Sequence, residues 1–262
     1  MKPEILRTAL EDVVLNISSL GLGKAETFLN KSVSPPSKYA VQAAVKLLLQ
    51  INALKPGIGR PDAPEQLTAL GRLLAEIPIS PMLGKMVVLG AIFSCLDPIL
   101  SIACVLSEKD IFVISGQRKG RLFEVRKEFA RECKSDHLML VKIIKKWESR
   151  YLQGNSLDFC QRNCLNEKTL EAVFQMKQQL FEALRYRGLV GDKSLSNVNS
   201  ANEALVRAVV GAGLYPNVAK VSLTNGKNYT KYPILSNAIK HRINIHMRSV
   251  RQQFRYFQFY RC

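Results

Sequence analysis

The sequence predicts a mainly helical protein that ends in a short β-rich piece. Apolar residues recur at helical spacing over most of the chain up to about residue 215. Beyond Tyr215, short segments rich in β-branched or aromatic residues, such as "NVAKVSL" and "RYFQFY", are separated by turn residues. Hydrophobic residues make up 47% of the 262 residues, which is enough for packed cores. This length favours two or three small domains.

The first part of the chain contains two helical patterns and a turn-rich loop. The patterns are "LEDVVLNISSLG" and "SKYAVQAAVKLLLQINAL", and Ser37 is placed to cap the second. Residues 55–66, "KPGIGRPDAPEQ", are predicted to form an exposed loop because of their proline and glycine content. A short helix follows in "LTALGRLLAEIP", and the pattern of residues 81–190 is almost wholly helical.

The apolar segment 86–106, "MVVLGAIFSCLDPILSIACVL", is long enough to cross a membrane. Its middle holds Asp97–Pro98, however, which is typical of a helix start with Asp as the N-cap and proline at the first helical position. Ser80–Pro81 repeats this signal one helix earlier. Two short buried helices, 81–96 and 98–107, therefore explain the segment better than a membrane span.

Asp136 and His137 are adjacent, and the pair is either half of a catalytic dyad or the start of a helix. Ser135 is well placed as an N-cap, with Asp136 in the first turn at the positive end of the helix dipole. No recognisable motif marks a Ser or Cys nucleophile for the histidine. The structural interpretation is favoured. It gives the helix an apolar face of Leu140, Val141, Ile144 and Trp147, with Lys142, Lys145 and Lys146 on the opposite side.

The last predicted helix begins at Ser200, where "SANE" has the capping-box spacing to Glu203. It ends at Gly211–Gly213, since glycine is favoured just beyond a helix. The β-rich segments follow, with turns such as "TNGKN" between them.

Charge and cysteine usage limit the class of partner and the compartment. The formal net charge is +17, which favours a polyanionic partner, with nucleic acid ahead of an anionic membrane; plain solubility is the alternative. Cys95 and Cys104 lie in apolar runs, and Cys160 and Cys164 lack a second Cys/His pair at zinc-site spacing. Reduced cysteines and an N-terminus without an apolar signal core predict the nucleus or cytoplasm and not secretion.

Four stretches carry a family resemblance: "PEILRTALEDVVLNI", "LTALGRLLAEIPISPMLGKMVVLGAIFSCLDPILSIACVLS", "SDHLMLVKIIKKW" and "AGLYPNVAKV". In this order they resemble the C-terminal half of DEAH-box RNA helicases, in the branch of RNA helicase A and the G-quadruplex-resolving helicases. The resemblance covers nearly the whole chain. It implies a winged helix at 1–79, a helical ratchet domain at 80–190 and an OB-fold at 191–262.

The resemblance implies only a partial OB-fold. The family's His-Pro-x-Ser-Val element is similar to "IHMRSV", which keeps His246, Ser249 and Val250 and has Met247 in place of the proline. Few residues follow, although a five-stranded barrel needs all its strands to close. Four aromatic residues there either stack on bases or pack in the core: Tyr256, Phe257, Phe259 and Tyr260.

The motor of such a helicase is not encoded in these 262 residues. There is no GxxxxGK[ST] phosphate loop and no Asp-Glu-Ala-His stretch. "GQRKGR", residues 116–121, superficially resembles an arginine-finger motif but is interpreted as a solvated charged segment. We therefore expect that the chain binds no cofactor itself, that ATP and Mg²⁺ bind motor domains preceding Met1 in an intact relative, and that the chain alone does not hydrolyse ATP.

The resemblance implies an auxiliary portion that binds RNA and guides a single strand while the motor pulls it. Its partners would be RNA, or DNA, and the motor domains, without a membrane. The candidate RNA contacts are basic residues: Lys134, Lys142, Lys145, Lys146, Lys220, Lys227 and Arg248. The alternative is a protein-interaction module that docks helicase motors or their activators without binding RNA.

Overall fold

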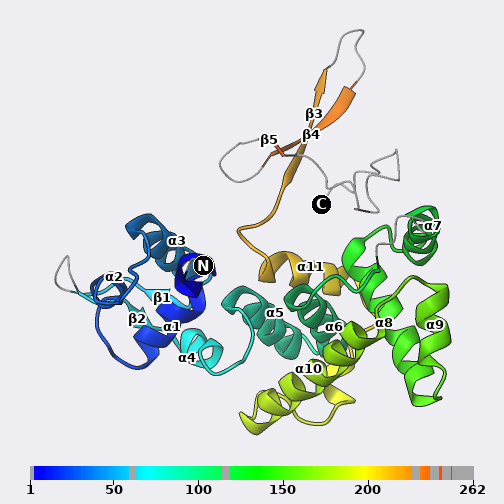
Figure 1. Ribbon diagram of the computed structural model, residues 1–262, viewed down its shortest axis with the longest axis horizontal. Coiled ribbons are helices and arrows are strands. Elements are labelled where there is room, and N and C mark those ends of the chain that lie inside the picture. Colours follow the sequence, from blue (N-terminus) through cyan, green and yellow to red (C-terminus); the bar gives the residue numbers. More distant parts are fainter. Residues whose placement is uncertain are drawn as a thin grey trace. The chain divides into compact units, whose positions relative to one another are not determined.

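The computed structural model describes residues 3–58, 63–113, 119–225, 231–236, 242–243 and 249. The chain divides into two compact units (Figure 1). Unit 1 comprises Met1–Leu89 and Ala212–Pro216, and unit 2 comprises Gly90–Gly211 and Asn217–Cys262. The predicted division into three domains, at 1–79, 80–190 and 191–262, stays a prediction.

Unit 1 is a small helical body with a short β-hairpin. Ser37 caps α3 by accepting a hydrogen bond from the Ala40 N–H at 3.2 Å, as predicted. The predicted loop 55–66 includes two strand residues at its ends, because Lys55 pairs with Gln66 and Leu54 with Leu67, and residues 56–65 connect the two strands. The elements are the 3-10 helix η1 (Glu4–Leu6), α1 (Glu11–Ser19), α2 (Ala25–Leu29), α3 (Lys38–Gln50), β1 (Leu54–Lys55), β2 (Gln66–Leu67) and α4 (Ala69–Leu74).

The core of unit 1 ties the hairpin to the helices. Val14 of α1 and Leu48 of α3 are fully buried. Thr68 caps α4 by accepting from the Gly71 N–H at 2.9 Å, and its hydroxyl donates to the Asn52 carbonyl at 2.7 Å. A Cβ on Gly71 would collide with the carbonyl oxygen of Ala53. Only glycine permits this close approach of α4 to the backbone before β1.

Unit 2 is a helical bundle followed by a small antiparallel sheet in which β4 lies between β3 and β5. The helix α5 (Pro81–Ile92) and the helix α11 (Glu203–Gly213) each have residues in both units. The other elements are α6 (Leu96–Ser107), α7 (Lys119–Ala130), α8 (Asp136–Leu152), α9 (Ser156–Arg162), α10 (Glu167–Tyr186), the 3-10 helix η3 (Leu195–Asn197), β3 (Lys220–Asn225), β4 (Lys231–Ser236) and β5 (Arg242–Ile243).

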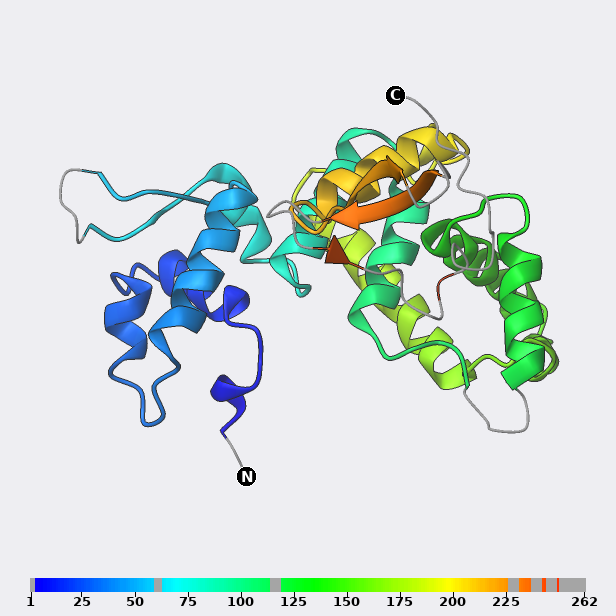
Figure 2. The same cartoon turned by 90° about the horizontal axis from the view of Figure 1, so that it is seen from above.

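The core of unit 2 lies among α6, α8 and α10, which contact one another. Residues Ile99 and Ile102 of α6 and Trp147 of α8 have no exposed surface. The helices α7 and α9 also contact α8, and both views show these three helices, in green, next to one another (Figures 1 and 2). The mainly helical class predicted from the sequence is thus confirmed, and in unit 2 the helices α7, α9 and α10 pack against α6 or α8.

The segment 86–106 forms two helices, as predicted, but their bounds and the cap differ from the prediction. The helix α5 ends at Ile92, and α6 begins at Leu96. Asp97 therefore lies inside α6, and the prediction that it is the N-cap is wrong. The Asn197 side-chain oxygen accepts from the Asp97 N–H at 2.6 Å, so a residue far along the chain satisfies this helix end. In the described ranges no helix is both long and apolar enough to span a bilayer.

Two other helix starts test the sequence patterns. Ser135 caps α8, accepting from the Leu138 N–H at 3.5 Å, as predicted. The predicted start of α11 at Ser200 is wrong, because the helix begins at Glu203 and Asn202 accepts from the Leu205 N–H at 3.1 Å. The Ser200 hydroxyl instead donates to Asn197 at 2.8 Å.

The apolar face of α8 is rotated relative to the prediction. Ile144 and Trp147 are buried, as predicted, but Leu140 and Val141 are only half-buried. The remaining buried positions are Leu138, Met139 and Ile143. The helices α6, α7, α9 and α10 all contact α8, so their arrangement decides which side chains of α8 are buried, and the spacing of apolar residues along α8 alone does not predict it.

The cysteines are free, as far as the described residues show. Cys95 and Cys104 are fully buried core residues, as predicted, and Cys133, Cys160 and Cys164 are also buried. No group of ligand-type side chains suited to a metal ion occurs in the described part of the chain. The partial OB-fold stays a prediction: three strands are described in residues 191–262, and the candidate aromatic residues Tyr256, Phe257, Phe259 and Tyr260 lie outside the described residues.

Candidate nucleic-acid interface

The helix α8 places three of the predicted lysines on its outer side. Lys145 and Lys146 are exposed, and Lys142 is half-buried. One turn further on, the exposed Arg150 extends this row. We call Lys142, Lys145, Lys146 and Arg150 the basic face of α8. The sequence prediction missed Arg150, although its spacing of four residues from Lys146 was a signal for it.

The cations of the basic face differ in how far they are neutralised. Lys142 donates to the Glu132 carboxylate at 2.8 Å, and this hydrogen bond raises the pKa of Lys142. Within the described part of the chain, no ion pair involves Lys145, Lys146 or Arg150. The Lys146 Nζ lies 5.0 Å from the centroid of the Phe129 ring, which a cation can approach favourably. The free positive charge is therefore concentrated in the C-terminal half of α8.

The other predicted contacts are described only in part. Lys134 is exposed in the turn before α8, with a left-handed φ of 46°, and its N–H donates to the Ala130 carbonyl at 2.7 Å. Lys220 is the first residue of β3, and the structure describes its backbone but not its side chain. Lys227 and Arg248 lie outside the described residues. These four residues stay predictions.

A tight turn brings α9 back against the end of α8. Gly154 has a φ of 73°, its N–H donates to Tyr151, and the Asn155 N–H donates to Arg150 at 2.9 Å. This is the Schellman arrangement, which ends a helix at a glycine and reverses the chain. It creates a hollow of about 420 Å³, here called the α8–α9 pocket, lined by Lys146, Ser149, Arg150, Gln153 and Phe159.

The α8–α9 pocket is positively charged and partly aromatic. Lys146 and Arg150 contribute two positive charges, and no carboxylate is among the lining residues. Nearby acids are already engaged: Asp158 pairs with Arg162 at 2.9 Å, and Glu148 pairs with Lys177 at 2.6 Å. The pocket therefore suits a phosphate group next to a flat ring.

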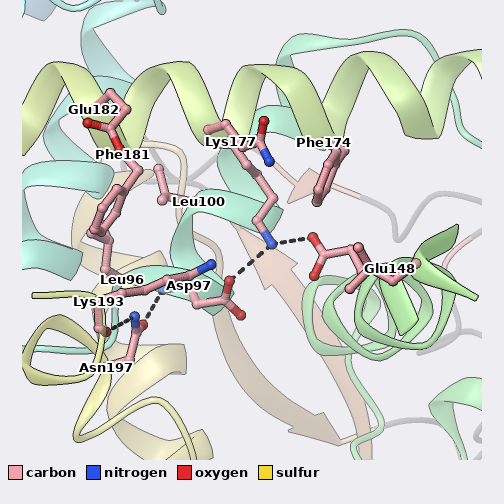
Figure 3. Close-up of a pocket in the computed structure, with 12 residues that line it drawn as sticks. Leu96, Asp97, Leu100, Glu148, Phe174, Lys177, Phe181, Glu182, Lys193 and Asn197 are labelled. Atoms are coloured by element: carbon pink, nitrogen blue, oxygen red, sulfur yellow. Dashed lines mark hydrogen bonds and ion pairs between the residues drawn. The ribbon is translucent and has the colours of Figure 1, made fainter. Parts of the chain in front are cut away.

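A second hollow of about 560 Å³ lies among α6, α8 and α10 (Figure 3). We call it the Lys177 cavity. Five large apolar side chains line it: Leu96, Leu100, Leu152, Phe174 and Phe181. Its charged residues are Asp97, Glu148, Lys177, Glu182 and Lys193. The lining is thus mainly apolar and carries one more negative than positive charge.

Lys177 crosses this cavity and joins three helices. Only 7% of the residue is exposed, and its Nζ lies 3.1 Å from Asp97 of α6 and 2.6 Å from Glu148 of α8 (Figure 3). Burial alone would lower the pKa of Lys177, but the charges of Asp97 and Glu148 more than offset this and raise it. Lys177 therefore stays charged and neutralised by its partners. The sequence prediction missed it, although a lysine within the apolar stripe of "VFQMKQQLF" was a signal.

The Asp136–His137 pair has structural contacts. Asp136 lies 3.6 Å from Arg126, and Ser249 donates to its carboxylate at 2.5 Å. Burial lowers the pKa of His137, with the Asp136 charge acting in the opposite direction. These contacts and the Ser135 cap support the helix-start interpretation over a catalytic dyad.

Two family models match the chain. Residues 44–79 match the helicase associated domain (HA2), winged-helix, and residues 80–140 match the helicase associated domain (HA2), ratchet-like.

Longer relatives are similar to most of this chain. The chain is 43% identical over 231 residues to the ATP-dependent DNA/RNA helicase DHX36 of Bos taurus, in an alignment covering 86% of the chain and 22% of the relative. It is 38% identical to the DExH-box ATP-dependent RNA helicase DExH3 of Arabidopsis thaliana, covering 84% of the chain and 18% of the relative. It is 33% identical to the ATP-dependent RNA helicase DHX29 of Mus musculus, in an alignment covering 87% of the chain and 17% of the relative. The chain thus spans about a fifth of the length of these relatives.

Proposed function

We propose that this chain, which carries the helicase-associated winged-helix and ratchet-like domains of the DEAH-box helicases, holds single-stranded RNA or DNA for a helicase motor through the basic face of α8. The observation that carries the proposal is the row of exposed cations on α8, of which Lys145, Lys146 and Arg150 have no ion pair in the described structure. In a chain with a net charge of +17, such a row attracts phosphates irrespective of sequence.

Guiding a strand requires weak and sequence-independent contacts. Lysine and arginine side chains on a rigid helix provide them, since they follow the backbone phosphates and release bound counterions. The names of the relatives support RNA and DNA as ligands. ATP and Mg²⁺ would bind motor domains and not this chain, and the site of action would be the nucleus or cytoplasm.

The test is a binding titration of the full chain with labelled oligouridylate at several salt concentrations. If each cation of the basic face takes one phosphate, the logarithm of the binding constant falls with the logarithm of the salt concentration with a slope of about −3. Binding that is undetectable at low salt, or independent of salt, would contradict the proposal.

A second candidate function is protein docking, which the Lys177 cavity favours. Leu152 at its edge is 79% exposed, and a mainly apolar hollow suits a protein side chain better than a phosphate. Under this function the chain would dock a helicase motor or its activator without binding RNA. Salt-independent capture of a purified helicase motor, without affinity for oligouridylate, would favour it over the first.

A further inference from the structure

The α8–α9 pocket combines a flat ring with two unpaired cations, and the rest of the basic face does not. We propose that this pocket holds one nucleotide of a single strand, with its phosphate on Lys146 and Arg150 and its base on Phe159. This inference rests on the proposed function and adds a base contact to the phosphate contacts. The ligand of the pocket is thus one unpaired nucleotide.

The two cations are placed to share one phosphate. Lys146 and Arg150 are four residues apart on α8, so their side chains leave the same side of the helix. Both are exposed, and both line the pocket. An arginine fork binds a phosphate with two parallel hydrogen bonds, and a lysine adds a mobile point charge.

The aromatic part is fixed before any ligand binds. Phe159 is half-buried, and its ring meets that of Phe129 edge to face, with centroids 6.4 Å apart and planes at 82°. Phe129 in turn lies under Lys146. Because packing already restrains Phe159, stacking a base on it costs little side-chain entropy.

The remaining lining residues suit the polar parts of a nucleotide. Ser149 offers a hydroxyl and Gln153 a carboxamide, and both can donate and accept hydrogen bonds. The glycine turn at Gly154 fixes the position of α9 relative to α8. The volume of about 420 Å³ is within the range of small-molecule sites.

A consequence is selectivity for unpaired nucleic acid. A base can stack on Phe159 only when it is free of its neighbours, as in single strands, loops and ends. In duplex RNA the bases are stacked inside the helix. Its phosphates would contact Lys146 and Arg150, but its bases would not contact the Phe159 ring. The pocket thus distinguishes a separated strand from the duplex that precedes it.

The experiment compares oligouridylate with an abasic ribose-phosphate oligomer of the same length. Phe159→Leu should weaken binding of oligouridylate about tenfold, equivalent to about 1.4 kcal/mol, and leave the abasic oligomer unchanged. Phe123→Leu is the matched control, because Phe123 is an exposed phenylalanine of α7 outside the pocket. It should leave both ligands unchanged.

A second variant avoids any effect on packing. Ser149 is exposed on α8, so Ser149→Asp should fold normally while it places a negative charge next to the phosphate position. It should weaken binding of both oligomers, and the neutral Ser149→Asn, which adds no charge, should weaken it much less. Wild-type protein should also bind the single strand more tightly than a duplex of equal phosphate number.

The outcomes separate the pocket from the proposed function. If the wild-type chain binds no oligomer, the proposed function fails and the pocket with it. If it binds with the expected salt slope but Phe159→Leu changes nothing, only the pocket inference is overturned. If Phe159→Leu weakened binding of the abasic oligomer as much as that of oligouridylate, the pocket would be a general anion site and base recognition would be overturned. Binding of oligoglutamate by the wild-type chain as tight as that of oligouridylate would have the same consequence.

Discussion

Two lysines of unit 2, Lys146 and Lys177, each line a hollow next to aromatic rings, but their surroundings differ. Lys177 is buried and lies between two carboxylates from other helices. Lys146 is exposed, lies next to an aromatic ring and forms no ion pair among the described residues, although its charge also helps to lower the pKa of Glu132. The charge of Lys177 is therefore used within the fold, whereas that of Lys146 is available to a ligand. A net charge of +17 says how many cations are in excess but not which of them face a partner.

The largest expected effect comes from removing the buried cation. Lys177→Met should lower the free energy of unfolding by about 3 kcal/mol, because it leaves Asp97 and Glu148 facing each other without a cation. This is the low end of the usual range, since the Asp97 side chain is 38% exposed. Chemical denaturation measures the destabilisation, and the folded protein should bind oligouridylate as before.

Controls for this variant are available in the same helices. Arg185→Met on α10 removes an exposed cation, 60% exposed at its side chain, and should change stability little. The triple variant Asp97→Asn, Glu148→Gln and Lys177→Met removes the charges together and should recover most of the stability. A stable Lys177→Met variant with weakened RNA binding would reverse the roles assigned to the two lysines.

The contrast also shows what the sequence could predict. Ser37 and Ser135 cap helices within three residues of themselves, so their roles follow from local spacing. Asn197 caps α6 from 100 residues away, and Lys177 meets partners on two other helices. Such contacts depend on tertiary packing, which a pattern along one helix does not contain.

The candidate site also has a part that local spacing predicts and a part that depends on tertiary packing. The three lysines of α8 could be named from helical periodicity. The α8–α9 pocket could not, because it requires the turn at Gly154 to bring Phe159 across from Arg150. Helical periodicity also could not predict that Glu132, ten residues before Lys142, neutralises this lysine.

The second prediction concerns the exposed cations. Replacing Lys142, Lys145 and Lys146 together with Gln should weaken binding to unrelated single strands by similar factors, because phosphates carry no sequence information. The salt slope should become shallower by about 0.7 for each phosphate that the variant no longer neutralises. Because Lys142 already pairs with Glu132, Lys142→Gln alone should change the slope less than Lys146→Gln.

Stability is the control for the triple variant. The three side chains face away from the core, so the free energy of unfolding should remain nearly unchanged. Lys168→Gln removes one exposed cation from α10 and should leave the slope as in the wild type. An unchanged slope in the triple variant would remove α8 from the binding surface.

A smaller effect is expected at the start of α8. Ser135→Ala should lower the free energy of unfolding by about 1 kcal/mol, because the Leu138 N–H no longer has a side-chain acceptor. Ser135→Asp keeps an acceptor at this position and should retain most of the stability. Denaturant titrations of the two variants measure the difference, and equal destabilisation would show that the cap contributes nothing.

The smallest effect is expected for His137, and its sign depends on pH. Burial lowers the pKa of this imidazole in the folded chain below its ordinary value, so the unfolded chain binds the proton more readily. Stability should therefore fall as the pH drops through the unfolded pKa of about 6.5 and level off below the folded pKa. His137→Gln should remove this part of the pH dependence, measured by denaturation between neutral and mildly acidic pH. His137→Ala should leave the affinity for oligouridylate unchanged at neutral pH, since the residue lies before the basic face and is neutral there. A folded His137→Ala variant without RNA binding would instead make His137 part of the interface, and the division between structural and ligand-binding residues along α8 would have to begin one turn earlier.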